Sequence, residues 1–574
     1  MMNKKVILFL LVLAGGIFLR IVLFSTHPGG LNQDEASIGY DAWAIMNYGM
    51  DRNGYTLPVH MVSWGSGQNA LYAYFSMPFI RLFDLNIFSV RCVNLIFGLF
   101  TIIAVFFIVK KFKSYNTALL AMTLVAFSPW HMMMSRWGLE SNLLPAMIIL
   151  GIWVLFESIS KNILLIPAAF LFGLSLYAYG AAYVVITLFF LVMAIYIFIK
   201  KLFPLKICIA AAGVFAVVAT PIYLFILTNL FKLGDITLFG LQIPQMNVPR
   251  MTEQIGFSFS EAIVNVASPL LGQFDGSEWN AIPASSLFYI YCLPFTVFGI
   301  VKAFHEKHIF NFILLAALFC SFPLVLIYNY ANVNRMNVSY LPLLIFTAFG
   351  IAEVYQNKDK YNSILHTAFV YSFPAVLIYS FPVILVYLFP EMPVNTYENI
   401  RLMNTSGLHL PIFIVLGIIV LFSVRRISKI KRVIVVSIFP VLLLAFIIQY
   451  FGRNYEAIIR TEFFHSLDSA IYKAVEITDP YQNIYITTDI NMPYIFVLFY
   501  LKIPPKTYLD TVQFEDLNVE FQQVKAFDRY IFDISGAKKN LPGVYLVSSK
   551  DFDELNLTAD NVYSYRGYKV LTLN

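Results

Sequence analysis

Two adjacent carboxylates stand directly after the first apolar run of the sequence. Asp34 and Glu35 follow the run at 6–24, separated from it by only a short turn. Ionised groups at the edge of a bilayer are costly unless they face water, a partner or a substrate. A carboxylate placed there could take a proton from an attacking hydroxyl group. The alternative is that Asp34 caps a helix beginning near Ala36, with Glu35 in the first turn of that helix.

Further polar and aromatic residues lie in three short stretches between later apolar runs, at 131–142, 177–183 and 329–337. Arginines hold phosphates by charge-assisted, often bidentate hydrogen bonds. A carboxylate opposite Arg136 and Arg335 therefore predicts a site that binds a phosphate and deprotonates an attacking hydroxyl. The candidate site residues are Asp34, Glu35, Asp41, His131, Arg136, Glu140, Tyr177, Tyr179, Tyr183, Asp275, Glu278, Arg335 and Asn337.

Several of these candidates have a plainer structural interpretation. Arg136 and Glu140 are four residues apart and would form an ordinary ion pair on one helix face. Arg335 would contact lipid headgroups from its asparagine-rich turn. Interfacial residues of a membrane protein are the plainer interpretation of His131, Tyr177, Tyr179 and Tyr183. Solvated turn residues are the plainer interpretation of Asp275 and Glu278. The sequence leaves both interpretations open.

The composition is that of an integral membrane protein. Of the 574 residues, 59% are hydrophobic and only 13% are charged, with a mean hydropathy of +0.72. Repeated apolar runs of roughly 17 to 25 residues fit helices that cross a hydrocarbon core of about 30 Å. The net charge of +6 does not indicate a nucleic-acid partner, because the basic residues gather between the apolar runs.

The cysteines support neither a zinc site nor a disulfide framework. All four lie in or beside apolar runs without CxxC spacing: Cys92, Cys208, Cys292 and Cys320. They are interpreted as small buried apolar residues.

We predict thirteen membrane-spanning helices, at 6–24, 87–109, 117–134, 143–160, 162–178, 181–199, 207–229, 285–303, 309–328, 338–354, 364–389, 410–424 and 433–451. Lysines and arginines gather in alternate loops, for example at 110–113, 200–206 and 425–432, whereas the intervening loops carry only scattered basic residues. By the positive-inside rule, this pattern predicts a multi-pass protein of the cell membrane with a cytoplasmic N-terminus and an extracytoplasmic C-terminus. All four polar clusters then lie on the outer face.

Outside the membrane we expect two outer loops, at 25–86 and 230–284, and a C-terminal tail at 452–574. We predict that the tail forms a small α/β domain, which follows a transmembrane domain at 1–451. Apolar residues at helical spacing indicate a helix from Glu462 to about Ile477. Short β-branched and aromatic runs indicate strands at Ile484–Thr488, Tyr530–Ile534, Val544–Val547, Val562–Tyr565 and Tyr568–Thr572.

Together these residues resemble the GT-C glycosyltransferase superfamily, in particular its protein-mannosyltransferase and aminoarabinose-transferase-like branch (family 39/83-type). The resemblance rests on the Asp34-Glu35 pair after the first span and on the Ser-Arg-x-x-x-Glu turn at 135–140. It also rests on the Tyr-x-Tyr-Gly-Ala-Ala-Tyr motif at 177–183 and on the soluble C-terminal domain. It covers nearly all of the membrane part, to about residue 451.

The resemblance implies a polyprenyl-phosphate-linked sugar as donor and an extracytoplasmic acceptor, which is a protein, a glycopolymer or a lipid. Asp34 would be the general base of an inverting, one-step transfer, and Glu35 would shape the acceptor side. Arg136 and Arg335, with Tyr183, would stabilise the phosphate that leaves. Members of the wider superfamily differ in whether they use a divalent cation such as Mg²⁺ or Mn²⁺. The sequence has no obvious cage of metal ligands, and we predict no cofactor.

Two other classes of protein fit parts of this pattern. A flippase or transporter of cell-envelope precursors also needs polar groups at membrane depth, but it predicts charges within the spans and symmetry between two halves. The spans here are almost free of acids, and no internal repeat is evident. A scaffold that acts only as an assembly partner predicts that Asp34→Asn changes nothing.

Overall fold

The computed structural model describes residues 3–249, 275, 277, 279–282, 287, 292–324, 332–357, 428–452, 462–479, 482–537, 541–555, 559 and 561–573. Two predicted spans, at 364–389 and 410–424, and the candidate Glu278 lie outside these residues. So do parts of the predicted spans at 285–303 and 309–328.

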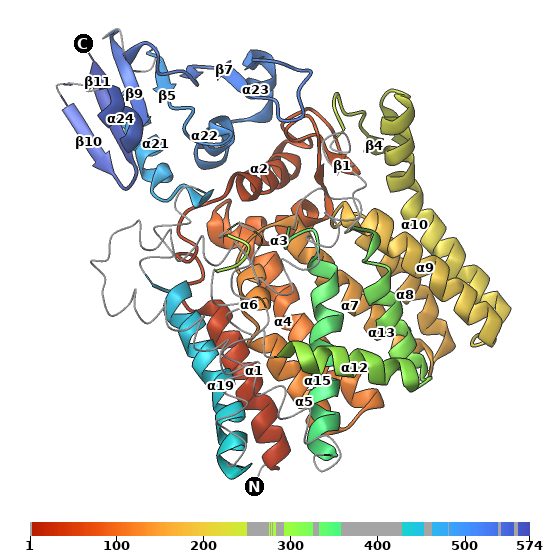
Figure 1. Ribbon diagram of the computed structural model, residues 1–574. Coiled ribbons are helices and arrows are strands. Elements are labelled where there is room, and N and C mark those ends of the chain that lie inside the picture. The colour runs from red at the N-terminus through yellow and green to blue at the C-terminus, as the bar shows by residue number, and fades with distance from the viewer. Residues whose placement is uncertain are drawn as a thin grey trace.

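A bundle of apolar helices forms one end of the molecule (Figure 1). Its helices include α1 Lys4–Ile21, α4 Ile87–Phe112, α5 Tyr115–Ala126, α6 Pro129–Met134, α7 Glu140–Ser158, α8 Leu165–Ser175, α9 Ala181–Lys200, α10 Leu205–Phe231, α12 Leu293–His305, α13 Ile309–Phe319, α15 Asn337–Gln356 and α19 Ser428–Tyr450. Within the described residues, five helices are long and apolar enough to cross a membrane, namely α4, α7, α9, α10 and α15. The number of thirteen spans stays a prediction.

The predicted span at 117–134 is not one uninterrupted helix. Helix α5 ends at Ala126, and the short helix α6 begins at Pro129. The hydroxyl of Ser128 accepts a hydrogen bond from the backbone N–H of His131, and proline is well suited to the first position of a helix. This Ser-Pro pair therefore ends α5 and starts a new helix.

Helices α12 and α15 cross at two glycines. A Cβ atom on Gly299 would lie 2.0 Å from the carbonyl oxygen of Phe346, and one on Gly350 would lie 2.0 Å from that of Phe295. Only glycine permits so close an approach, which is a common way for membrane helices to pack.

The first outer loop folds over one end of the bundle. It contains α2 Gln33–Tyr48, the strand pair β1 His60–Met61 and β2 Gln68–Asn69, and α3 Leu71–Phe83. The second outer loop contributes the hairpin β3 Ile236–Leu238 and β4 Leu241–Ile243. The backbone of Val59 donates a hydrogen bond to the carbonyl of Gln242, which joins the two loops.

The tail is an α/β unit built on a mixed seven-stranded sheet of order β10-β11-β9-β5-β8-β7-β6. Its strands are β5 Ile484–Ile486, β6 Gln513–Phe514, β7 Val524–Phe527, β8 Tyr530–Ile531, β9 Gly543–Ser548, β10 Asn561–Tyr565 and β11 Tyr568–Leu573, and its helices are α21 Leu467–Glu476, α22 Pro493–Leu501, α23 Pro505–Thr511 and α24 Ser549–Leu555. All five predicted strands are present, and α21 confirms most of the predicted helix. Strands β6 and β7 and helices α22 to α24 were not predicted.

Helix α22 fixes the tail to the first outer loop, because it packs on α2 between the sheet and the bundle (Figure 1). Gly39 of α2 lies under this contact, where a Cβ would meet Phe499 of α22 at 2.7 Å and Val90 of α4 at 2.6 Å. The backbone N–H of Gln522 donates to the carbonyl of Trp64 at 2.9 Å. The tail is thus packed against the end of the bundle that carries α2.

Candidate functional site

A cavity of about 500 Å³ lies where the bundle, the first outer loop and the tail meet. It is lined by residues from well separated parts of the chain: Gln33, Asp34, Trp64, Gln68, Leu139, Glu140, Ser141, Tyr179, Trp279, Asn332, Asn334, Arg335, Glu462, Asn491, Met492 and Phe521. Each of the four polar clusters found in the sequence contributes at least one residue. The cavity combines three acids, one arginine, several amides and four aromatic rings.

Asp34 reaches the cavity from the first turn of α2. The helix is capped by Asn32, whose side-chain oxygen accepts a hydrogen bond from the backbone N–H of Asp34 at 2.9 Å. Glu35 completes this capping box by accepting from the backbone N–H of Asn32 at 3.1 Å. The alternative in which Asp34 itself caps the helix is therefore wrong.

Glu140 and Tyr179 enter from two other sides. Glu140 is the first residue of α7, where the positive end of the helix dipole favours an anion, and it is only 3% exposed. Tyr179 lies in the short turn that joins α8 to α9. These positions bring two carboxylates and a phenol to one cavity.

Arg335 enters from a turn that precedes α15 and is held by hydrogen bonds at its backbone. Its N–H donates to the side chain of Asn332 at 3.1 Å, and the N–H of Val333 donates to Asp275 at 2.7 Å. Asp275 also accepts from the amide of Asn280 at 2.8 Å. Burial raises the pKa of Asp275, which supports the turn and does not line the cavity.

Glu35 faces away from the cavity and is fully buried. Its carboxylate accepts two hydrogen bonds from the guanidinium of Arg91, at 2.7 and 2.8 Å, and one from the backbone N–H of Gly138 at 2.7 Å. Arg91 also donates to the carbonyls of Pro28 and Gly30 at 2.8 Å. This ion pair ties α2, α4 and the turn before α7 together, directly behind Asp34.

Arg136 and His131 are also buried away from the cavity. The guanidinium of Arg136 donates to the carbonyls of Leu19, Arg20, Leu23 and His27, and so satisfies the C-terminal end of α1. It also lies 5.6 Å from the ring centre of Tyr450 and 5.3 Å from that of Phe451.

The ring of His131 contacts Arg20, with Nδ1 lying 2.7 Å from Nη2. Neither His131 nor Arg136 is brought to the cavity that holds Asp34.

Three further candidates, Tyr177, Tyr183 and Asn337, do not line the cavity. The hydroxyl of Tyr177 donates to the carbonyl of Val218, and the hydroxyl of Tyr183 accepts from the amide of Asn69. Asn337 accepts from the indole of Trp130 at 2.7 Å. These contacts fix the helices and loops from which the cavity residues project.

Asp41 belongs to a fully buried charged cluster under the tail. Its carboxylate lies 3.6 Å from Arg52 and accepts from the Arg52 backbone N–H at 3.2 Å. Burial raises the pKa of Asp41, and the charge of Arg52 opposes that rise. Burial and the charge of Asp41 raise the pKa of Asp51 to about 7.

Arg52 connects this cluster to the cavity wall. It donates to the hydroxyl of Ser37 at 2.8 Å, and that hydroxyl donates to Gln68 at 2.8 Å. The guanidinium carbon also lies 4.8 Å from the ring centre of Trp64. Gln68 and Trp64 both line the cavity, so Arg52 holds two wall residues from behind.

The sequence predicted no role in the site for Arg91, Arg52 or the tail residues Glu462, Asn491 and Phe521. Arg91 lies in an apolar run, which is itself a signal of a buried partner, whereas Arg52 lies in the polar turn at 51–54 and carried no such signal. The tail residues carried no signal, because only the packing of the tail brings them to the cavity. Within the described residues, no group of three or more His, Cys, Asp and Glu side chains could hold a metal ion.

No protein-family model and no curated protein matches the sequence. Solved structures do match: ArnT from Cupriavidus metallidurans in its apo state is 13% identical, over 99% of this chain and 98% of that one, with a TM-score of 0.56. The same ArnT bound to undecaprenyl phosphate is 12% identical, over 99% and 97%, with a TM-score of 0.58. An apo oligosaccharyltransferase from Archaeoglobus fulgidus reaches a TM-score of only 0.46, at 10% identity over 95% and 69%.

The likeness to ArnT extends over the whole length of both chains and shows the fold. The protein is a polytopic, mainly helical membrane protein with the fold of ArnT and a small sheet-containing C-terminal region. The fold expected from the sequence is therefore confirmed.

Proposed function

We propose that this protein is a glycosyltransferase that moves a sugar from a polyprenyl-phosphate carrier to an extracytoplasmic acceptor with inversion. One observation carries the proposal: Asp34, Glu140 and Arg335 come from three distant segments to one cavity at the end of an apolar bundle. The GT-C fold agrees with it, and one of the two ArnT structures is bound to undecaprenyl phosphate. A hydrophobic donor explains why the site lies beside membrane helices.

Asp34 acts as the general base. Its carboxylate takes the proton from the acceptor hydroxyl while that oxygen attacks the anomeric carbon. The bond from this carbon to the phosphate oxygen breaks at the same time, and the lipid phosphate leaves with the electron pair. The single displacement inverts the anomeric configuration.

Arg335 stabilises the negative charge that grows on the leaving phosphate. It replaces the pair of arginines expected from the sequence, because Arg136 binds the end of α1. Glu35 positions Asp34 through its ion pair with Arg91, one residue from the base. Glu140 and Tyr179 are placed to contact substrate hydroxyls from the opposite walls.

In this proposal residues 1–451 form the transmembrane catalytic part, and 452–574 form an extracytoplasmic domain that closes the cavity. The N-terminus is cytoplasmic. The two chain ends lie at opposite ends of the molecule in Figure 1, which agrees with termini on opposite sides of the membrane.

The test is a donor panel. Purified protein in lipid vesicles is incubated with radiolabelled polyprenyl-phosphate sugars, and both sugar release and transbilayer movement of the lipid are followed. We expect release or transfer from at least one donor, with an inverted anomeric configuration in the product. Transbilayer movement without release from any donor would contradict the proposal in favour of a flippase.

A further inference from the structure

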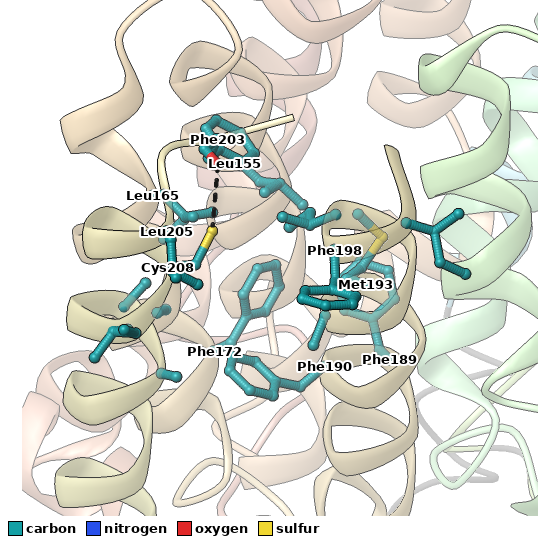
Figure 2. A pocket seen from close by; sticks show the side chains of 18 of the residues that line it. Leu155, Leu165, Phe172, Phe189, Phe190, Met193, Phe198, Phe203, Leu205 and Cys208 are labelled. Carbon is teal, nitrogen blue, oxygen red and sulfur yellow. Dashed lines mark hydrogen bonds between the residues drawn. The ribbon is translucent and has the colours of Figure 1, made fainter. Parts of the chain in front are cut away.

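A second cavity, of about 710 Å³, lies between helices α7, α8, α9 and α10 (Figure 2). Its walls are almost entirely apolar, with the rings of Phe172, Phe189 and Phe190 around its interior. Among the described residues that line it, Lys201 alone is charged. Nothing in the proposed transfer reaction uses this cavity.

The cavity lies at the end of α9 that is remote from the catalytic cavity. The turn that precedes α9 places Tyr179 in the catalytic cavity, whereas Lys201 caps the other end of the helix. A helix of 20 residues is about 30 Å long. Phe189 is the α9 lining residue of the second cavity that lies nearest to this turn, and it is ten residues from Tyr179, so about 15 Å along α9 separates the two cavities.

The depth of the cavity matches the hydrocarbon thickness of one leaflet of a bilayer. Its lining on α9 runs from Phe189 to Lys201, which spans roughly 18 Å at about 1.5 Å per residue. Half of a hydrocarbon core of about 30 Å is about 15 Å. One acyl chain of a lipid in that leaflet fills this depth.

Around the cavity, α9 and α10 expose apolar side chains at the surface of the bundle. Phe198 is 75% exposed and Ile209 is 64% exposed, and both line the cavity. Such apolar exposure on membrane-crossing helices is a lipid-facing surface. In Figure 1 the two helices stand together at one edge of the bundle.

Three lysines lie where α9 ends and α10 begins. Lys200 is the last residue of α9, Lys201 caps that helix and lines the cavity, and Lys206 is the second residue of α10. In the described part of the chain none of the three is paired with an acid, whereas Lys111 lies 2.8 Å from Glu157. Basic groups at the mouth of an apolar crevice match an anionic headgroup.

We propose that this cavity binds one acyl chain of an anionic phospholipid, with its headgroup held by Lys200, Lys201 and Lys206. The occupant is a phospholipid of the leaflet at the basic end of the bundle. It is distinct from the polyprenyl donor, whose phosphate belongs at the other end.

Lysines at a helix C-terminus also interact favourably with the helix dipole. That role alone predicts no preference among lipids.

The test is native mass spectrometry of the full-length protein in detergent, with an equal mixture of phosphatidylglycerol and phosphatidylcholine that carry the same acyl chains. We expect at least about a fivefold preference for phosphatidylglycerol in the wild type. The triple variant K200Q/K201Q/K206Q should bring the ratio close to one. The double variant K4Q/K5Q, at the same end of the bundle, should keep the preference.

A second variant fills the cavity without touching the lysines. Ala212 lines the cavity and is exposed, so Ala212→Trp should abolish retention of one lipid. Val217, on the same helix, is 74% exposed and outside the cavity, and Val217→Trp is the matched control. A preference that survives both the triple variant and Ala212→Trp would overturn the proposal. Displacement of the lipid from the wild type by an equal concentration of polyprenyl phosphate would also overturn it, because the cavity would then hold the donor tail.

Discussion

The guanidinium of Arg91 forms a bidentate ion pair with the carboxylate of Glu35, in which Nε lies 2.7 Å from Oε1 and Nη2 lies 2.8 Å from Oε2. Both side chains are fully buried. Removal of one partner from such a pair leaves an uncompensated buried charge, at a cost of about 3–5 kcal/mol.

We therefore expect Glu35→Gln to lower the stability of the protein by about this amount, measured by thermal unfolding in detergent. The double variant Glu35→Gln/Arg91→Met should recover part of the loss, because it removes the unpaired charge. A Glu35→Gln variant of unchanged stability would contradict a positioning role for Glu35.

Substitution of Arg335 should lower the transfer activity, whereas substitution of Arg136 should lower the stability of the fold. Arg335 lines the cavity, so Arg335→Gln should lower kcat about 10²–10³-fold while the melting temperature stays unchanged. Arg136→Gln should lower the melting temperature, because the carbonyls at the end of α1 lose their donors. Sugar-transfer kinetics and thermal unfolding of both variants measure these effects. A loss of melting temperature in Arg335→Gln, with a loss of activity alone in Arg136→Gln, would contradict the roles given to the two arginines.

Asp51 should make stability depend on pH. Burial first, and then repulsion from Asp41, raise the pKa of Asp51 from 3.8 to about 7 in the folded protein. Between about pH 4 and pH 7 the unfolded chain has lost a proton that the folded protein keeps, so stability should fall as the pH rises through this window.

Asp51→Asn should flatten that dependence, since the asparagine oxygen still accepts from the N–H groups of Asn53 and Tyr55. Thermal unfolding from pH 4 to pH 8 measures both slopes. Asp235→Asn, at an exposed acid of the second outer loop, is the control. Equal slopes in the wild type and in Asp51→Asn would refute the assignment to Asp51.

Two helical glycines should respond in opposite ways to alanine. Gly350→Ala forces a Cβ to within 2.0 Å of a carbonyl oxygen on α12, which must push α12 and α15 apart and destabilise the protein. Gly213 of α10 has nothing within 4 Å, so Gly213→Ala should stabilise it by up to about 1 kcal/mol. Melting temperatures of the two variants provide the comparison. A stable Gly350→Ala variant would mean that the helices do not cross there.

Much of the site could be predicted from the sequence, because the positions of lysines and arginines in the loops indicate on which side of the membrane each loop lies. The basic loops alternate along the chain, and this alternation placed the four polar clusters on one face before any contact was known. Asp34, Glu140, Tyr179 and Arg335 do line one cavity. The strands of the tail were equally visible in its short β-branched and aromatic runs.

Contacts between distant residues could not be predicted in this way. Glu35 and Arg91 are 56 residues apart, and no local pattern links them. The contacts of Arg136 could not be predicted, because the sequence does not reveal that the carbonyls at the end of α1 lie beside it. Helix α22 was missed because nine apolar residues are too few to span a membrane, although they are enough to form a buried contact.

The role of Asp34 as the general base is tested by comparing the wild type with Asp34→Asn, using a donor that the wild type accepts. Asparagine keeps the shape of the side chain and cannot take a proton. We predict that transfer of radiolabelled sugar falls at least about 10²-fold in a variant that keeps the wild-type melting temperature and still binds the lipid donor. The exposed control Asp235→Asn should transfer sugar at the wild-type rate. Transfer at an undiminished rate by folded Asp34→Asn would contradict the role of Asp34 as the base.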